Sequence, residues 1–294
     1  MSIMRMSKGV HNMGKKKKRI SGLVIRYVLI LVFCVPMLLP LLWMLSTALK
    51  DNAGVFVMPP QWIPDKFMWE NFSRGLTKID FWSRFRNSVI IAVSVTVGQI
   101  LSCMSVGYAI ARIKFPGKKV WFYLIISSMM IPGAVTMLPV FRLNIALGFY
   151  GTWWPMILPA FLGAPFQTFL ARQFMSGIPK SYDEAARIDG ANRLQILVRV
   201  IAPMCKPLIT VIAIQAFQGA WNDYMGPLLY VISKPEKWPL SLAISRLSSS
   251  TFSVEWNVFM AADIVYLLPI LIIFFFGQNY FMQGLGSMNN TGVK

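Results

Sequence analysis

Long apolar blocks alternate with more polar stretches along most of the chain. Each block is close to the roughly 20 residues that a helix needs to cross a bilayer. The pattern predicts about six membrane-spanning helices. They are Leu23–Thr47, Asn87–Ala111, Val120–Phe141, Thr152–Ala171, Cys205–Leu229 and Met260–Met282. The fold class that follows is all-α, a polytopic membrane protein with about six transmembrane helices.

These blocks also divide the chain into three parts. Residues 1–22 form a basic tail that we expect in the cytoplasm, residues 23–282 form the transmembrane domain, and residues 283–294 form a second cytoplasmic tail. Several spans contain proline or glycine. Because proline removes a backbone donor and bends a helix, two interpretations stay open. The bends could shape the walls of a transport pathway, or they could be ordinary kinks in packed helices.

The cations of the connections predict the orientation in the membrane. The segment up to Arg26 carries no acid, and the second-to-third connection carries four cations and no acid. These four are Arg112, Lys114, Lys118 and Lys119. The fourth-to-fifth connection is also rich in cations. Positive connections stay on the cytoplasmic side, so six spans place all three segments and both termini there.

The overall composition agrees with a membrane protein. The chain has 56% hydrophobic residues and a formal net charge of +18, whereas soluble domains have about 45–50% apolar residues. The cations flank the apolar blocks instead of forming one basic face, so membrane topology explains them better than nucleic-acid binding. Cys34, Cys103 and Cys205 are isolated in sequence, so neither a zinc site nor a disulfide framework is predicted.

The connection between the fourth and fifth spans has the clearest local pattern. Residues Ile178–Asn192 predict a short helix, a glycine stop and a second helix. Ser181 is expected to cap the first helix, with Glu184 completing a capping box, and Gly190 is expected to end it with a positive φ. From these features alone, the loop is either a docking element for a cytoplasmic partner or an amphipathic surface helix.

The same loop resembles the EAA motif of bacterial ABC-importer permeases. The matching residues are Glu184-Ala185-Ala186, Asp189-Gly190-Ala191 and Pro203, while Val200 and Ala202 replace the usual isoleucine and leucine with other apolar residues. The resemblance implies that the loop, about residues 178–207, forms coupling helices that fit a groove on an ATPase subunit. The candidate coupling residues are Ser181, Asp183, Glu184, Ala185, Ala186, Asp189, Gly190, Ala191 and Pro203.

Two further segments resemble the carbohydrate branch of these permeases. Trp221–Tyr224 with Pro227-Leu228 is similar to the fifth-span segment, and Gly284-Leu285 with Gly292–Lys294 is similar to the tail of the smaller, MalG-like maltose-type subunit. The resemblance implies a permease subunit of an importer for a carbohydrate, in particular an oligosaccharide, in a bacterial inner membrane. The implied partners are a homologous second permease, two ATPase subunits and an extracytoplasmic solute-binding protein.

Polar residues within the apolar blocks are candidates for the substrate pathway. Asn222, Asp223 and Tyr224 offer amide, carboxylate and hydroxyl groups suited to a sugar, and Gln215 is a further candidate. Acids inside a membrane are costly and are functional candidates by default. For Asp223 and Asp263 the alternative is an interfacial position beside a cation.

The chain lacks the residues of an energy-converting or catalytic site. Residues Gly9–Lys16 imitate a P-loop, but Lys16 stands where Ser or Thr must hold Mg²⁺. His11 is the only histidine, so Ser-His or Cys-His catalysis is not predicted. We therefore expect a transport subunit without its own cofactor, and ATP and Mg²⁺ bound by the partner ATPase. The alternatives are a secondary transporter driven by an ion gradient, a membrane-embedded enzyme, or an ABC permease for a solute other than a sugar.

Overall fold

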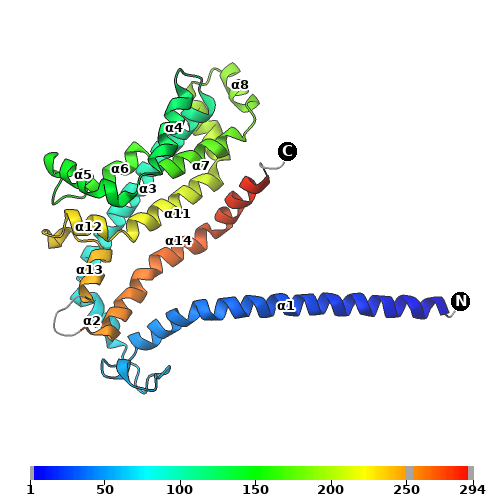
Figure 1. Cartoon of the computed structure of the whole chain (residues 1–294), viewed down its shortest axis with the longest axis vertical. Coiled ribbons are helices and arrows are strands. Elements are labelled where there is room, and N and C mark those ends of the chain that lie inside the picture. Colours follow the sequence, from blue (N-terminus) through cyan, green and yellow to red (C-terminus); the bar gives the residue numbers. More distant parts are fainter. Residues whose placement is uncertain (1–2, 249–253, 291–294) are drawn as a thin grey trace. The chain divides into compact units, whose positions relative to one another are not determined.

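The computed structural model describes residues 3–248 and 254–290, and for residues 3–22, 24 and 279–290 it describes the backbone alone. The described part is built of helices and contains no β-strand (Figure 1), which confirms the all-α class. The chain divides into two units. One comprises Met1–Arg74 and Glu255–Ile264, and the other comprises Gly75–Val254 and Val265–Lys294.

The segments of the first unit meet at the end of its long first helix. Helix α1 (Ile3–Ala48) continues through Pro36 and Pro40, and its part Ile25–Ala48 is long and apolar enough to cross a membrane. A short 3₁₀ turn, η1 (Gly54–Phe56), follows. The expected basic tail, with its P-loop-like stretch and His11, lies where side chains are not described.

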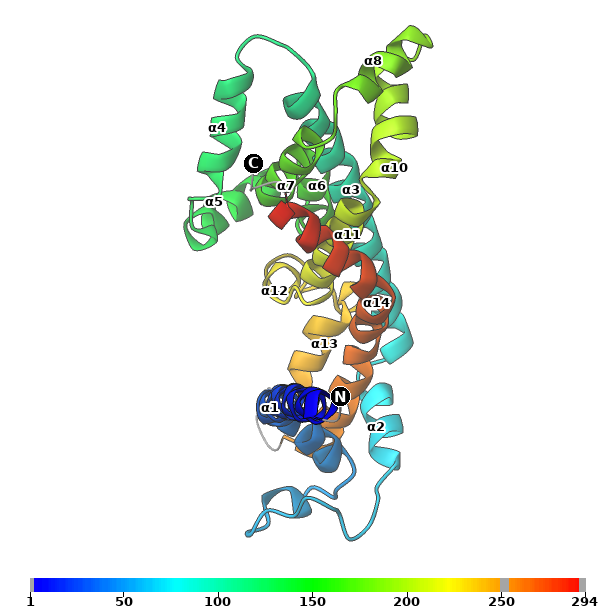
Figure 2. The same cartoon turned by 90° about the vertical axis from the view of Figure 1, so that its right-hand side faces the viewer.

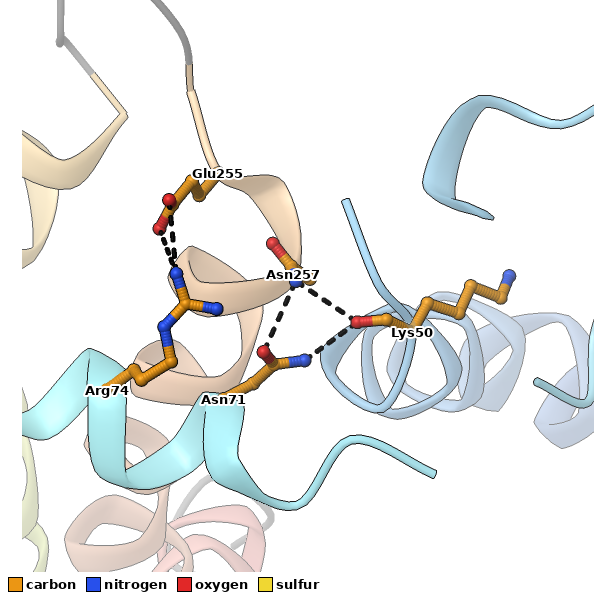
Figure 3. Close-up of polar contacts among 5 residues, drawn as sticks. All are labelled: Lys50, Asn71, Arg74, Glu255 and Asn257. Carbon is orange, nitrogen blue, oxygen red and sulfur yellow. Dashed lines mark hydrogen bonds and ion pairs between the residues drawn. The ribbon is translucent and has the colours of Figure 1, made fainter. Parts of the chain in front are cut away.

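The last carbonyl groups of a helix have no partner within the helix, and asparagine side chains supply partners at the end of α1 and at Lys50 just after it. Figure 3 shows the bonds to Lys50. Asn71, in α2 (Glu70–Lys78), donates from Nδ2 to the carbonyls of Ala48 at 2.9 Å and Lys50 at 2.7 Å. Asn257 donates to the same Lys50 carbonyl at 3.1 Å and to Asn71 Oδ1 at 3.3 Å. Both asparagines are buried, so this network joins three segments that are far apart in sequence.

Charged groups surround this network. Arg74 forms an ion pair with Glu255 at 3.3 Å (Figure 3). The Lys50 ammonium lies 4.3 Å from the centre of the Trp43 ring and donates to the Gln61 carbonyl. Burial lowers the pKa of Lys50 from its ordinary value, because a charged ammonium loses hydration when it leaves water.

Replacement of Asn71 with alanine should weaken this unit. The change removes the asparagine donor of the Ala48 carbonyl and one of the two donors of the Lys50 carbonyl, and an unsatisfied buried group typically costs about 1–3 kcal/mol. We expect the thermal unfolding midpoint of the purified transporter to fall by several degrees, since 1 kcal/mol corresponds to roughly 2–4 °C for a domain of this size. Asn52→Ala, at an exposed position, is the control. Equal midpoints for the two variants would mean that the network does not stabilise the fold.

The second unit is built around α3 (Phe81–Arg112). This helix packs against α6 (Trp154–Leu162), α7 (Pro165–Ser176), α11 (Lys206–Trp221) and α13 (Leu240–Leu247). Figure 1 shows α3, α7 and α11 at the centre of this group of helices. Helix α3 is therefore the common packing partner of these four helices.

Two glycines explain how closely the neighbours approach α3. A β-carbon at Gly98 would lie 2.5 Å from the ring of Phe161, and one at Gly107 would lie 2.6 Å from the β-carbon of Ala171. Contacts this short are not tolerated between real side chains. Small residues let the backbones of membrane helices approach each other closely, so Gly98 and Gly107 fix the packing of α3 on α6 and α7.

Not every predicted span is a single helix. In the described part, three helices are long and apolar enough to cross a membrane: Ile25–Ala48, Phe81–Arg112 and Trp256–Gln278. Two bent pairs raise the number to five if each pair is one span. The first pair is α4 (Lys118–Ser128) with α5 (Gly133–Ala146), bent by 101°, where Val120–Phe141 had been predicted.

The predicted span Thr152–Ala171 is two helices, α6 and α7, separated at Gly163 and Ala164. Gly163 has φ +107°, and Ala164 is extended because the following Pro165 disfavours a helical residue before it. The predicted span Cys205–Leu229 is also interrupted. Helix α11 ends at Trp221, and the chain becomes helical again only in α12 (Met225–Tyr230).

Candidate functional site: a coupling loop and a polar segment

The loop after α7 has the predicted helix–glycine–helix form. Its first helix, α8, is Ser181–Ile188, and its second begins as α9 (Arg193–Gln195). Gly190 has φ +81°, a conformation that costs roughly 1–2 kcal/mol for a residue with a β-carbon. The amide of Gly190 donates to the Arg187 carbonyl at 3.0 Å, which closes the last turn of α8. The prediction for Gly190 is confirmed.

The predicted capping box at Ser181 is wrong. An N-cap residue has non-helical backbone angles, but Ser181 is the first residue of α8, and Lys180 before it is already helical with φ −70° and ψ −19°. The amides of Asp183 and Glu184 donate to the Lys180 carbonyl at 3.0 and 3.1 Å. The first turn is therefore closed by the backbone, and no side-chain cap is present at this helix start.

The capping box lies instead at the second helix. The Gln195 amide donates to Asn192 Oδ1 at 2.9 Å, and the Asn192 amide donates to Gln195 Oε1 at 2.8 Å. Asn192 is extended, with ψ 168°, as a cap requires. The second helix then continues through η2 (Ile196–Ile201), a π-helical segment, and α10 (Ala202–Met204). It ends at Cys205 with a bend of 86° into α11.

Helix α8 has one face turned toward the protein and one turned away. Asp183 and Ala186 are buried. Tyr182, Ala185 and Ile188 are exposed at a spacing of three, so they share one side of the helix. Ile188 is 87% exposed. Such an apolar face in a polar loop is typical of a surface that contacts another protein.

A buried ion pair joins α8 to the end of α3. Arg112 Nη1 lies 3.3 Å from Asp183 Oδ2, and the two side chains are 3% and 6% exposed. Arg112 Nη2 also donates to the Ile178 carbonyl at 2.7 Å. Since a buried charge is strongly destabilising without its partner, the pair holds α8 in one position on α3.

Apolar packing supports the same attachment. One cluster includes residues of α3, α7, α8 and η2. Its buried members include Tyr108, Met175, Ile178, Ala186, Ile196, Leu197 and Ile201. The loop is thus packed against the C-terminal part of α3 and against α7.

The other predicted coupling residues take different positions. Asp183 and Ala186 lie on the inner side of the loop, and Ala191 is half-buried. The exposed ones are Ser181, Glu184, Ala185, Asp189, Gly190 and Pro203. Pro203 lies in α10, just before the bend at Cys205.

The predicted pathway residues lie around the end of α11. The Tyr266 hydroxyl lies 2.9 Å from both Asn222 Oδ1 and the Trp221 carbonyl oxygen, so these two acceptors share its single proton. The rings of Tyr266 and Trp221 stack with centres 5.8 Å apart. Tyr266 belongs to α14 (Trp256–Asn290). Asn222 is exposed, so Tyr266 fixes its orientation while leaving its amide nitrogen available.

Asp223 and Tyr224 differ in their environments. The Asp223 carboxylate accepts a bond from the Gly226 amide at 3.0 Å, and its backbone carbonyl accepts from the Ser241 hydroxyl at 2.7 Å. Asp223 therefore organises the turn that leads into α12. Tyr224 is 40% exposed, so its side chain remains accessible.

Gln215 faces a polar partner on another helix. Gln167 Nε2, in α7, donates to Gln215 Oε1, in α11, at 3.2 Å. Both are half-buried within apolar helices. Among the described residues, no group of three side chains could hold a metal ion. The polar groups of this segment are amides, the Tyr224 hydroxyl and the Asp223 carboxylate, all of which can form hydrogen bonds.

The helices of this site match a known protein family. Residues 103–287 match the family described as binding-protein-dependent transport system inner membrane component. The chain belongs to this family of permeases. The matched residues include α7, α8, the second helix of the loop and α11, so the permease is a membrane-embedded transport subunit.

Sequence alignments with two named relatives extend over most of this permease. The arabinooligosaccharides transport system permease protein AraQ of Halalkalibacterium halodurans is 32% identical over 241 residues, which are 82% of this chain and 84% of AraQ. The sn-glycerol-3-phosphate transport system permease protein UgpE of Yersinia enterocolitica is 30% identical over 265 residues, 88% of this chain and 94% of UgpE.

A solved structure shares the fold. The permease aligns with a chain of a bacterial ABC transporter involved in the import of the acidic polysaccharide alginate, with a TM-score of 0.79 and 24% identity. The alignment covers 90% of this chain and 97% of the other. The expected architecture of an ABC-importer permease is therefore confirmed.

Three residues of the site were not predicted as site residues. Arg112 was predicted only as a topological cation, and Gln167 and Tyr266 were not singled out. Gln167 is a polar residue in an apolar helix, which is a signal that the sequence offers. Tyr266 has no such signal, because a tyrosine in an apolar block is common and only the fold brings it to Asn222.

Proposed function

We propose that this permease is one of two membrane subunits of an ATP-driven ABC importer for a carbohydrate, in particular an oligosaccharide. The observation that carries the proposal is the exposed apolar face of α8, held against α3 by the buried pair of Arg112 and Asp183. A rigidly attached helix with an uncovered face is suited to transmit the movement of a partner. In this proposal the partner is an ATPase subunit.

The remaining partners follow from the same proposal. Two ATPase subunits supply ATP and Mg²⁺ binding, a homologous permease completes the pathway, and an extracytoplasmic protein delivers the solute. Because α8 must face the ATPase, the cation-rich connections lie in the cytoplasm together with both termini. Membership of a binding-protein-dependent family supports this set of partners.

Coupling is proposed to run through α3. Closure of the ATPase dimer would displace α8, and the pair of Arg112 and Asp183 would transmit the displacement to α3. Helix α3 packs against α6, α7 and α11. Gln167 and Gln215 lie on two of these helices, so the displacement would change the distance between pathway side chains.

The substrate class is proposed from the pathway side chains and from one relative. Gln215, Asn222 and Tyr224 offer amide and hydroxyl groups, which can pair with sugar hydroxyls. The relative AraQ is named for arabinooligosaccharides, which supports an oligosaccharide. The relative UgpE is named for sn-glycerol-3-phosphate, so a small phosphorylated polyol is the competing solute in the test.

The proposal is tested with the complete transporter in proteoliposomes that contain ATP and Mg²⁺. With the binding protein outside, we expect uptake of a labelled oligosaccharide that stops without ATP and continues when an ionophore collapses ion gradients. Uptake that instead requires an ion gradient would identify a secondary transporter. Uptake of glycerol-3-phosphate in the absence of any oligosaccharide uptake would overturn the proposed substrate class.

A further inference from the structure

A cavity of about 550 Å³ lies between α8 and the connection from α3 to α4. Six cationic side chains line it, together with two acidic ones, Asp183 and Glu184. The cationic residues are Arg112, Lys114, Lys118, Lys180, Arg187 and Arg193. We call this cavity the basic pocket. It combines residues of three segments that the sequence separates.

The contacts within the basic pocket leave most of its positive charge uncompensated. Asp183 is paired with Arg112. Lys118 Nζ donates to the carbonyls of Ala111 at 3.3 Å and Ile113 at 3.1 Å, at the end of α3.

The basic pocket contains four further cations but only one further acid, Glu184. Within the described ranges 3–248 and 254–290, none of these four forms an ion pair. They are Lys114, Lys180, Arg187 and Arg193. Cations gathered without counter-charges repel one another, so an anion in this cavity would be stabilising.

The position of the basic pocket along the membrane helices indicates the source of that anion. Arg112 is the last residue of the membrane-spanning helix α3, and Lys118 is the first residue of the apolar pair α4 and α5. Trp121, one turn into α4, is 59% exposed, as expected for an aromatic residue at the membrane interface. The basic pocket therefore lies at the ends of two apolar segments, which is where lipid headgroups are expected.

We propose that the basic pocket binds the phosphate of an anionic phospholipid headgroup. Clusters of Lys and Arg beside the cytoplasmic ends of membrane helices favour such lipids, and a phosphate oxygen accepts charge-assisted hydrogen bonds from several cations at once. The assignment to the cytoplasmic leaflet rests on the proposed function, which places α8 on that side. A bound headgroup would connect the start of α4 to α8 and stabilise the coupling loop.

The experiment uses the purified complete transporter and measures retained lipid by native mass spectrometry. Phosphatidylglycerol and phosphatidylcholine with the same acyl chains are titrated separately, and inorganic phosphate forms a third arm. The test variant is Lys114→Gln with Lys180→Gln, both at exposed positions. The control is Lys119→Gln, which changes a neighbouring exposed lysine that does not line the basic pocket.

We expect the wild type to prefer phosphatidylglycerol and the double variant to bind it about tenfold more weakly or worse, since each cation near the membrane surface contributes to the attraction. Lys119→Gln should resemble the wild type. Equal retention by the double variant and the control would overturn the proposal.

Two other results would also overturn it. In one, inorganic phosphate displaces phosphatidylglycerol at equal concentration, which would identify a free anion as the ligand. In the other, the double variant loses the ATPase while its lipid retention is unchanged, which would identify a protein contact. Lipid retention is measured without transport, so it tests the lipid proposal even if the proposed carbohydrate uptake is not observed.

Discussion

Asp183→Ala should leave the permease in the membrane but lower co-purification of the ATPase and ATP-driven uptake by about tenfold or more. The variant leaves the Arg112 guanidinium buried without its carboxylate. Removal of one partner from a buried ion pair costs roughly 3–5 kcal/mol, and this cost falls on the attachment of α8 to α3. We measure co-purified ATPase and uptake at equal amounts of permease.

A double variant separates loss of the attachment from loss of a charge. Arg112→Met with Asp183→Leu replaces the pair by apolar side chains of similar volume, a change that is often neutral or stabilising at buried sites. We expect it to restore most of the ATPase binding. Glu236→Ala removes an exposed carboxylate elsewhere and should have no effect. If the double variant is as defective as Asp183→Ala, the pair does not act by holding α8.

The sequence predicts those features that local chemistry decides. The glycine at position 190 is expected because only glycine adopts a positive φ without cost, and the structure has it there. The apolar blocks predict membrane helices because burial in lipid depends on composition and length. The resemblance of the loop to the EAA motif depends on residues that lie close together in sequence, and the family match confirms the family.

The local pattern does not decide between two candidate capping boxes, and it does not show where a long apolar helix breaks. Ser181 and Glu184 fit a capping box, and so do Asn192 and Gln195. Only the second pair forms one, because the chain before Ser181 is already helical. Long apolar blocks also conceal breaks, as at Gly163, where a glycine and a following proline interrupt the helix.

Long-range pairs are beyond the reach of pattern analysis. Arg112 precedes Asp183 by 71 positions, and a cation at the end of a span is fully explained by topology. The fold brings the two together because α7 packs along α3 and returns the chain to the same end. The same reasoning applies to Tyr266 and Asn222, which α14 and α11 bring into contact.

The second substitution with a large expected effect on ATPase binding lies on the exposed face of α8. Ile188 is 87% exposed and Leu194, in the second helix of the loop, is 68% exposed. Substitution of an exposed residue changes the stability of the permease itself by little, usually within about 0.5 kcal/mol. At the centre of a protein interface the same change can cost about 2 kcal/mol or more, because an apolar contact is replaced by a buried charge.

Ile188→Asp should therefore lower ATPase co-purification by about tenfold or more, since about 1.4 kcal/mol corresponds to a factor of ten in binding. Ile188→Leu keeps an apolar side chain of equal size and should retain binding, and Ser176→Asp, at an exposed position on α7, should resemble the wild type. The thermal midpoint of Ile188→Asp should be unchanged, whereas that of Asp183→Ala should fall. Full co-purification with Ile188→Asp would mean that this face of α8 does not contact the ATPase.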